Sequence, residues 1–215
     1  MFVNIEGTDG AGKQTQSVLL AKEIGALLMS YPRYDKESSF AVKSFLRGDL
    51  GTLSEVSPYT ASITYAVDRA ISYNTEPEWE QYRTGIHMVT DRWVMSNITH
   101  QSARLKGEEK EKFIQWVTEL EYVHNKLPKP DINIFLDMPV WASEELCKAR
   151  INKATGESKK DIIESDINEL NSIYNNAVEI AKRFDAIIIP CTEGNRIRSI
   201  EEIHADVMTA VRSKF

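Results

Sequence analysis

Two patterns of apolar residues alternate along the chain: short apolar runs and longer stretches with helical spacing. The short runs are rich in β-branched residues, which is typical of buried strands. They occupy residues 2–5, 27–31, 86–90, 132–136 and 186–190. The longer stretches predict helices over residues 14–27, 38–46, 58–74, 93–105, 108–125, 161–184 and from 199 to the C-terminus.

Strands that alternate with helices predict βαβ units and a parallel sheet that is buried on both faces. We therefore expect a three-layer α/β fold, a five-stranded parallel sheet flanked by helices. The chain has 215 residues, without an internal repeat or a linker, and we interpret residues 1–215 as a single domain. Ser199, followed by Glu202, has the capping-box pattern that starts a helix.

A glycine-rich loop, Gly-Thr-Asp-Gly-Ala-Gly-Lys at residues 7–13, joins the first strand to the first helix. Backbone N–H groups in such a loop form an anion site, to which the helix N-terminus adds a partial positive charge. Lys13 would place an ammonium group on the outer phosphates of ATP. A turn without a ligand is the alternative, but the spacing, the lysine and the flanking elements favour a P-loop. The residues expected to bind ATP are Gly7, Asp9, Gly10, Ala11, Gly12, Lys13, Gln14 and Thr15.

The position after the loop lysine departs from the usual pattern. A Ser or Thr there commonly supplies a hydroxyl for Mg²⁺, whereas this chain has Gln14. Either the Gln14 amide oxygen reaches the hydrated ion, or carboxylates elsewhere hold it. The candidates are Asp9 in the loop and Asp91 at the end of the third strand, where ligands of parallel sheets bind. Arg92 could hold a phosphate bidentately, although an Asp-Arg pair is also compatible with a simple helix start.

Four motifs follow one another along the chain. They are Glu-Gly-Thr-Asp-Gly-Ala-Gly-Lys at residues 6–13, Tyr-Pro-Arg at 31–33, Tyr-Ala-Val-Asp-Arg at 65–69 and Asp-Arg-Trp-Val-Met-Ser-Asn-Ile-Thr-His-Gln at 91–101. Their order and spacing resemble the thymidylate kinase family over nearly the whole chain. The resemblance implies a P-loop kinase that transfers phosphate from ATP, with Mg²⁺, to thymidine monophosphate (dTMP) in dTTP synthesis.

The resemblance also implies which residues meet the base. Tyr65 would stack on the pyrimidine, and Arg69 would reach its 4-carbonyl. Taken alone, Tyr65 is better explained as a core aromatic, and Arg69 as a salt-bridge partner of Asp68 or another neighbour. Asn97 and Gln101 would meet the base edge.

Other residues are implied for the methyl group, the phosphate and the sugar of the acceptor. Pro32 would line the 5-methyl pocket, Arg33 and Arg92 would lie at the phosphate, and Asp9 would face the sugar hydroxyl and the metal shell. Position 100 departs from the family, which commonly has a Tyr or Phe there, so His100 leaves sugar discrimination open. The implied acceptor-binding residues are Asp9, Pro32, Arg33, Tyr65, Arg69, Arg92, Ser96, Asn97, His100 and Gln101.

A cationic segment at residues 148–160 lies where nucleoside monophosphate kinases carry a lid. Family members without an arginine inside the phosphate loop supply basic groups from this lid, and the in-loop position here is Gly10. The lid candidates are Arg150, Lys153, Lys159 and Lys160, which would neutralise charge on the transferring group. For any one of them a solvated charge run is the alternative. The expected catalytic residues are Asp9, Lys13, Arg92 and Arg150.

Charge and composition argue against some classes of binding partner and cell compartment. A formal net charge of −6 argues against a nucleic-acid-binding protein, because phosphate backbones select basic faces. No apolar run approaches the roughly 18 residues needed to cross a bilayer, and the N-terminus does not resemble a secretory signal. Cys147 and Cys191 lie far apart and favour reduced thiols over a disulfide, so we expect a cytoplasmic protein. The resemblance implies a homodimer.

Two other functions stay open from the sequence. A kinase of the same fold could act on dUMP, a 5-modified pyrimidine nucleotide or a deoxynucleoside. Alternatively, the chain could be a regulator that binds a nucleotide without phosphorylating anything. A GTPase switch is disfavoured because residues 125–128, Asn-Lys-Leu-Pro, lack the acid of a guanine-binding motif.

Overall fold

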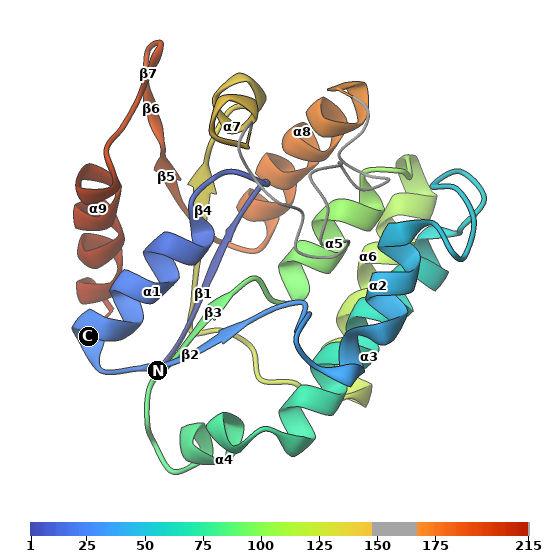
Figure 1. The fold of residues 1–215 in the computed structure, drawn as a ribbon, viewed down its shortest axis with the longest axis horizontal. Coiled ribbons are helices and arrows are strands. Elements are labelled where there is room, and N and C mark those ends of the chain that lie inside the picture. Colours follow the sequence, from blue (N-terminus) through green and yellow to red (C-terminus); the bar gives the residue numbers. More distant parts are fainter. Residues whose placement is uncertain (148–166, 215) are drawn as a thin grey trace.

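The computed structural model describes residues 1–147 and 167–214. Its centre is a sheet of five parallel strands in the order β2-β3-β1-β4-β5 (Figure 1). The strands are β1 Phe2–Gly7, β2 Leu27–Ser30, β3 Met88–Asp91, β4 Ile132–Asp137 and β5 Ile187–Pro190. The α/β fold with a five-stranded parallel sheet is therefore confirmed.

Helices cover both faces of the sheet. On one face α1 (Lys13–Ile24) packs beside α9 (Ile200–Arg212), and on the other α5 (Val94–Ser102) packs beside α8 (Ile167–Arg183). Helix α3 (Pro58–Thr75) packs against α5. The remaining helical elements are η1 Glu37–Ser39, α2 Phe40–Arg47, α4 Pro77–Arg83, α6 Gly107–Thr118, the π-helical turn η2 Glu119–His124 and α7 Val140–Cys147.

Alternation along β1 divides the core between the two faces of the sheet. Val3 belongs to a cluster with Leu20 of α1 and Val207 of α9. Phe2, one position earlier, points to the other face and packs edge-on against Trp93, with ring centroids 5.5 Å apart. This alternation is what a strand buried on both sides requires, because successive side chains point in opposite directions.

The face toward α5 also carries polar side chains that cross three strands. Asn4 donates from Nδ2 to Asn133 Oδ1 at 2.9 Å and to Glu6 Oε1 at 3.0 Å, and its Oδ1 accepts the Thr90 hydroxyl at 3.1 Å. The register sets Asn4 beside both Thr90 and Asn133. Because buried polar groups are costly without partners, these bonds favour one register and bring Glu6 to the carboxyl end of the sheet.

Local signals begin two helices as ordinary capping rules predict. The Ser199 hydroxyl accepts the N–H of Glu202 at 3.2 Å, and the Glu202 carboxylate accepts the N–H of Ser199 at 2.7 Å. The predicted capping box is thus confirmed. Ser57 caps α3 by accepting the N–H of Thr60 at 3.1 Å, and Pro58 follows at a position where its missing N–H has no cost.

Some elements differ from the sequence prediction. Helices α4 and α7 were not predicted, nor was the small hairpin of β6 Thr192–Glu193 and β7 Arg196–Ile197. These elements have two to eight residues, too few apolar positions to establish a period. The helix predicted over 108–125 is α6 followed by η2, because periodicity does not distinguish an α-helical turn from a π-helical one. The predicted start of the helix over 161–184 lies outside the described residues.

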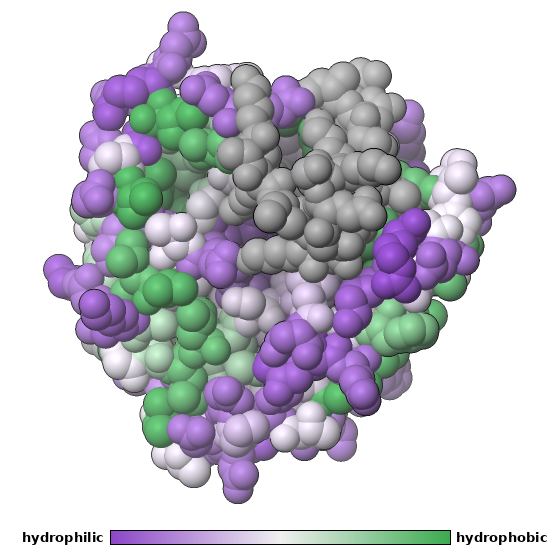
Figure 2. All heavy atoms as spheres, in the orientation of Figure 1, coloured by the Kyte–Doolittle hydropathy of each residue, from purple (hydrophilic) through white to green (hydrophobic). Residues whose placement is uncertain are grey.

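No helix in the described part of the chain is long and apolar enough to cross a membrane. On the face shown in Figure 2, outside the grey atoms, apolar residues form narrow strips between polar ones. Such mixing is ordinary for the surface of a folded domain.

The aromatic side chains of Phe2, Trp79 and Trp93, which pack together on one face of the sheet, lead to a prediction about stability. Trp79 of α4 is fully buried, lies 5.1 Å from Trp93 between ring centroids and donates its indole N–H to the Tyr31 hydroxyl at 2.9 Å. We expect Trp79→Ala to lower the free energy of unfolding by about 3–5 kcal/mol, measured by urea denaturation. The control Trp141→Ala, at a residue 44% exposed, should change it by less than about 0.5 kcal/mol. Equal losses in the two variants would contradict the assignment of this core.

Candidate active site

The glycine-rich loop leaves β1 at the carboxyl edge of the sheet and leads into α1. At Gly7 a Cβ would lie 2.8 Å from the carbonyl oxygen of Leu136, so only glycine allows this approach to β4. Gly12 is the N-cap of α1 and has a left-handed φ of 83°. Among the described residues no side chain caps this helix, so its first N–H groups are available to an anion.

Lys13 lies under the loop and is almost fully buried. Its ammonium group donates to the carbonyl oxygen of Thr8 at 2.7 Å and lies 3.9 Å from Asp9 Oδ1. Burial and then the charge of Arg92 lower the pKa of Lys13 to about 8, against the opposing effect of Asp9. The loop therefore holds a cation that is only partly stabilised before a phosphate binds.

Arg92 follows β3 on the other side of the loop. Its backbone has a left-handed φ of 69°, and its N–H donates to the carbonyl oxygen of Ile5 at 3.0 Å. The guanidinium group contacts the same Asp9 oxygen that Lys13 approaches. Burial lowers the pKa of Arg92, but the carboxylates of Asp9 and Asp91 outweigh it and raise the pKa above its ordinary value. The two cations, Lys13 and Arg92, thus converge on one carboxylate.

His100 lies one helical turn beyond Ser96, and Arg92 reaches both residues. Arg92 Nη1 is 3.3 Å from Ser96 Oγ and 3.3 Å from His100 Nε2. Burial and the charge of Arg92 lower the pKa of His100 to about 4, so its ring is neutral near pH 7. A guanidinium group only donates hydrogen bonds, so Nε2 accepts and the ring proton lies on Nδ1.

Asp91 offers a place for a hydrated metal ion. Its Oδ1 atom is buried and has no hydrogen-bond partner among the described residues, which is costly for a carboxylate oxygen. No group of three or more His, Cys, Asp or Glu side chains in the described residues could hold a metal by itself. The unpaired Asp91 oxygen would fit a Mg²⁺ ion carried by nucleotide phosphates and waters, because it could accept a hydrogen bond from a metal-bound water.

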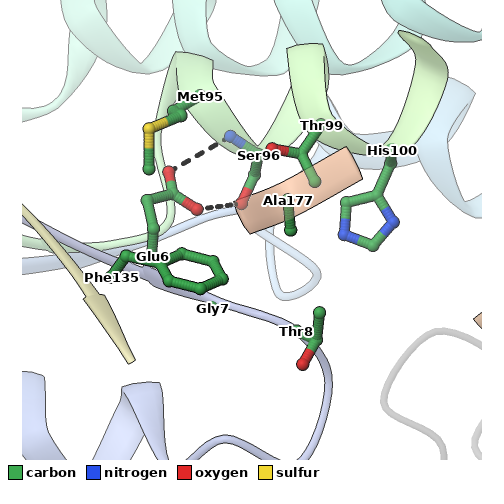
Figure 3. Close-up of a pocket in the computed structure, with 9 residues that line it drawn as sticks. All are labelled: Glu6, Gly7, Thr8, Met95, Ser96, Thr99, His100, Phe135 and Ala177. Carbon is green, nitrogen blue, oxygen red and sulfur yellow. Dashed lines mark hydrogen bonds between the residues drawn. The ribbon is translucent and has the colours of Figure 1, made fainter. Parts of the chain in front are cut away.

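Glu6 is a site residue to which the sequence analysis assigned no role. Its carboxylate accepts the N–H groups of Trp93 at 2.9 Å and Ser96 at 3.2 Å, and also the Ser96 hydroxyl. Figure 3 shows Glu6 and Ser96 facing each other on the wall of a cavity of about 10 Å³, with His100 on the same wall. An acid in an apolar strand, directly before the loop, was the available signal for this role.

Arg69 and Asn97 meet at a second buried carboxylate, Glu121 of η2. Arg69 donates from Nε at 3.0 Å and from Nη2, and Asn97 donates from Nδ2 at 3.1 Å. Burial lowers the pKa of Arg69, but Glu121 outweighs it and raises the pKa. The sequence analysis missed Glu121, because one acid in a charged helical segment carries no signal of its own.

The segment after β2 carries Pro32 and Arg33. Asp68 of α3 accepts the backbone N–H of Arg33 at 2.8 Å. The Arg33 guanidinium group is 3.4 Å from Ser72 Oγ and 3.6 Å from the Glu76 carboxylate. In this structure Arg33 therefore points to the junction of α3 and α4.

Three further predicted residues lie at the edges of the site. Tyr65 packs edge-on against Phe45, with ring centroids 6.3 Å apart. Gln14 and Thr15 are exposed in the first turn of α1. The lid predicted at residues 148–160, including its four basic candidates, lies outside the described residues.

Fold and site together define the class of protein. A phosphate loop between the first strand and first helix of a parallel sheet is the architecture of P-loop nucleotide-binding proteins. Two cations that converge beside that loop suit the transfer of a phosphoryl group between two phosphates. Residues 5–207 match the model of the thymidylate kinase family, and the chain therefore belongs to that family.

Individual relatives agree with this assignment. The thymidylate kinase of Mycobacterium tuberculosis strain H37Rv is 30% identical over 169 residues, which cover 74% of this chain and 76% of the relative. The probable thymidylate kinase of Pyrococcus abyssi is 27% identical over 218 residues, which cover 98% and 95%. The structure of thymidylate kinase from Candida albicans has a TM-score of 0.74 at 19% identity, covering 99% of this chain and 91% of that one. Deoxyadenosine kinase from M. mycoides has a TM-score of 0.66 at 15% identity, covering 99% and 100%.

The lowered pKa of Lys13 generates a prediction on pH dependence. The ammonium form attracts phosphate, and the free enzyme loses this form as pH rises through about 8. We expect kcat/KM for ATP to fall above that pH by about tenfold per pH unit. The alkaline limb of the pH profile, in which the rate falls as pH rises, should lie at higher pH for kcat than for kcat/KM, because bound phosphates raise the pKa of Lys13. Lys13→Arg, which stays protonated, should lack the limb in steady-state kinetics, and a limb that persists in this variant would refute the assignment.

Proposed function

We propose that this chain transfers the γ-phosphate of ATP to dTMP and so forms dTDP for dTTP synthesis. The observation that carries the proposal is the contact of Lys13 and Arg92 with one oxygen of Asp9. Lys13 belongs to the loop that would bind the donor, and Arg92 lies between β3 and α5, the helix that would face the acceptor. Their shared carboxylate lies where the two phosphates would meet.

In the proposed mechanism the phosphate loop and Lys13 hold the outer phosphates of ATP. Arg92 holds the phosphate of dTMP. An oxygen of this phosphate attacks the γ-phosphorus of ATP as the bond between the γ-phosphorus and the β-phosphate oxygen breaks, and ADP is released. The attacking oxygen is already ionised, so no strong general base is required. Mg²⁺, carried by the phosphates near Asp9 and Asp91, would neutralise developing charge when bound.

The acceptor residues stay proposals. Tyr65 would stack on the base, and Pro32 would line the 5-methyl pocket. Asn97 and Gln101 would meet the base edge, and His100 would lie near the sugar. Arg69 already donates to Glu121 from Nε and Nη2. It would therefore contact the 4-carbonyl of the base only through its remaining N–H groups. In the same way, Arg150 is proposed to act from the lid.

The alternatives keep the same fold. A deoxynucleoside kinase shares it, as the M. mycoides structure shows for that protein, and dUMP differs from dTMP only by the 5-methyl group. A nucleotide-binding regulator would need no acceptor-side cation, and the contacts of half-buried Arg92 with Asp9 and His100 favour an enzyme.

The proposed function is tested by a panel of acceptors with ATP and Mg²⁺, in which ADP release is measured. We expect turnover with dTMP and none with thymidine, which lacks the phosphate that Arg92 would hold. Turnover with dUMP should be about 10–200-fold less efficient, because one methyl group in a pocket contributes about 1–3 kcal/mol.

Arg92→Met should lower kcat for dTMP by at least about 100-fold, whereas Arg47→Met should not lower it. Arg47 pairs with Asp49 in an exposed position and lies outside the site. Turnover only with another acceptor would replace dTMP, and ATP binding without any acceptor-dependent ADP release would favour the regulator.

A homodimer and a cytoplasmic location complete the proposal. Three exposed apolar side chains recur at four-residue spacing on α3: Ile63, Val67 and Ile71, which are 46%, 41% and 43% exposed. Such a stripe on one helix face supports an interface with a second copy. Cys191 is a free, buried thiol whose pKa burial raises to about 12, which suits a reducing compartment.

The apolar stripe generates a prediction on assembly. In light scattering after gel filtration, the wild type should have twice the mass of one chain, and Val67→Glu should have the mass of one chain. The reason is that a buried, unpaired carboxylate in an interface is costly. The matched control Val18→Glu, at a residue 46% exposed on α1, should remain dimeric. A wild-type monomer, or a Val67→Glu dimer, would exclude this interface.

A further inference from the structure

Helix α5 carries two amide side chains one turn apart, Asn97 and Gln101, and both are buried. An amide can present either its oxygen or its N–H₂ group, so its position alone does not decide what it recognises. Here each amide forms a hydrogen bond with a charged side chain: Glu121, which only accepts, or Arg104, which only donates. This arrangement decides which atom of each amide is left without a protein partner.

Glu121 fixes Asn97. A carboxylate only accepts hydrogen bonds, and Glu121 accepts Asn97 Nδ2 at 3.1 Å. The same Nδ2 donates to the carbonyl oxygen of Ser62 at 3.2 Å, a second group that only accepts. The amide nitrogen must therefore face both groups, and Oδ1 faces away from them. This Oδ1 atom is buried and accepts no hydrogen bond within the described residues.

Arg104 fixes Gln101 in the opposite sense. Its guanidinium group only donates, and Nη1 donates to Gln101 Oε1 at 3.3 Å. Nη2 donates to the carbonyl oxygens of Leu53 and Val56, so the arginine is itself tied to the loop between α2 and α3. The amide nitrogen of Gln101 must point away from Arg104. Nε2 is buried and has no partner in the described part of the chain.

The two amides thus offer one acceptor, Asn97 Oδ1, and one donor, Gln101 Nε2. An N–H beside a carbonyl group, the imide edge of uracil and thymine, complements an acceptor beside a donor. Cytosine has an unprotonated ring nitrogen beside an amino group, which is the reverse pattern. A buried polar atom that faces its own kind stays unpaired, and this costs more than a hydrogen bond gains.

We propose that Glu121 and Arg104 are positioning residues that select a pyrimidine with an imide edge by fixing the polarity of Asn97 and Gln101. The inference rests on the proposed function and names the base chemistry of the same site. Neither residue needs to touch the substrate. Glu121 is the stronger case, because its carboxylate is fully buried and is shared by Arg69 and Asn97.

A purely structural role for either residue would weaken all pyrimidine nucleotides alike. The informative quantity is therefore a ratio, the dissociation constant of dCMP divided by that of dTMP, measured by calorimetry for each variant. The ratio for dUMP against dTMP is an internal reference, since both bases have the imide edge and this ratio should not change. Binding is measured without ATP, so the readout is independent of turnover.

We expect Glu121→Gln to lower the dCMP/dTMP ratio by about three- to tenfold, because the new side-chain amide can donate to Asn97 Oδ1 and only the Ser62 carbonyl then holds Asn97 Nδ2. Glu119→Gln is the matched control, the same change in the same π-helical turn at an exposed residue, and it should leave the ratio unchanged. An unchanged ratio in folded Glu121→Gln, with weaker binding of both nucleotides, would overturn the role of Glu121.

Because Glu121→Gln deprives buried Arg69 of its carboxylate, its unfolding temperature is measured first. If this variant does not fold, the Arg104 variants decide the proposal, since Arg104 is only half-buried. Arg104→Met should lower the dCMP/dTMP ratio by about tenfold, and Arg104→Lys, which still donates, should restore part of it. The control Arg83→Met, at an exposed arginine that also donates to a backbone carbonyl, should leave the ratio unchanged.

The outcomes separate the inference from the function on which it rests. Wild-type protein that forms no ADP with dTMP refutes the proposed function, whatever the ratios are. Wild-type turnover of dTMP, together with a ratio that neither Glu121→Gln nor Arg104→Met changes, refutes the positioning roles alone.

Discussion

The carboxylate of Glu6 joins β1, the strand that leads into the glycine-rich loop, to the start of helix α5. It accepts two backbone N–H groups at the start of α5, from Trp93 and Ser96, and the Ser96 hydroxyl. A carboxylate at this position satisfies donors that a helix leaves without partners and is stabilised by the helix dipole. Glu6 directly precedes Gly7, so a shift of α5 along the sheet would break these bonds. One buried carboxylate therefore ties the end of β1, where the loop begins, to the start of α5.

Within that frame, the charges of the site are balanced around Asp9. Lys13 and Arg92 repel each other, which contributes to the lowered pKa of Lys13, yet both approach the same Asp9 oxygen. Arg92 is held there with a left-handed φ of 69°, a conformation that costs about 1–3 kcal/mol in a non-glycine residue. The hydrogen bond from its N–H to Ile5 of β1 helps to maintain it. Asp9 supplies the largest share of the negative charge that acts on the two cations, and Asp91 and Glu6 add to it.

The predictable part of this structure is the part encoded by neighbouring residues. The phosphate loop, the capping box at Ser199 and the parallel α/β class depend on spacing within one segment, and each was predicted. The strand order and the carboxylates Glu6 and Glu121 depend on partners far away in the chain. Glu6 meets Ser96 across 90 positions and Glu121 meets Arg69 across 52, and no local pattern encodes such a pair. Local patterns therefore predicted the loop and the class of fold, whereas the long-range partners Glu6 and Glu121 emerged only from the structure.

The hydrogen-bond partners of the α5 side chains also keep the protonation states on this helix constant near neutral pH. Three neutral side chains on this helix, Asn97, His100 and Gln101, have their hydrogen-bond sense set by Glu121, Arg92 and Arg104. The pKa of Arg92 is raised, and that of His100 is lowered to about 4, so this pair keeps its charges near neutral pH. On the donor side, Lys13 has a pKa of about 8. Near neutral pH the side chains on α5 therefore keep one pattern of donors and acceptors, while the charge of Lys13 in the glycine-rich loop falls as the pH rises through about 8.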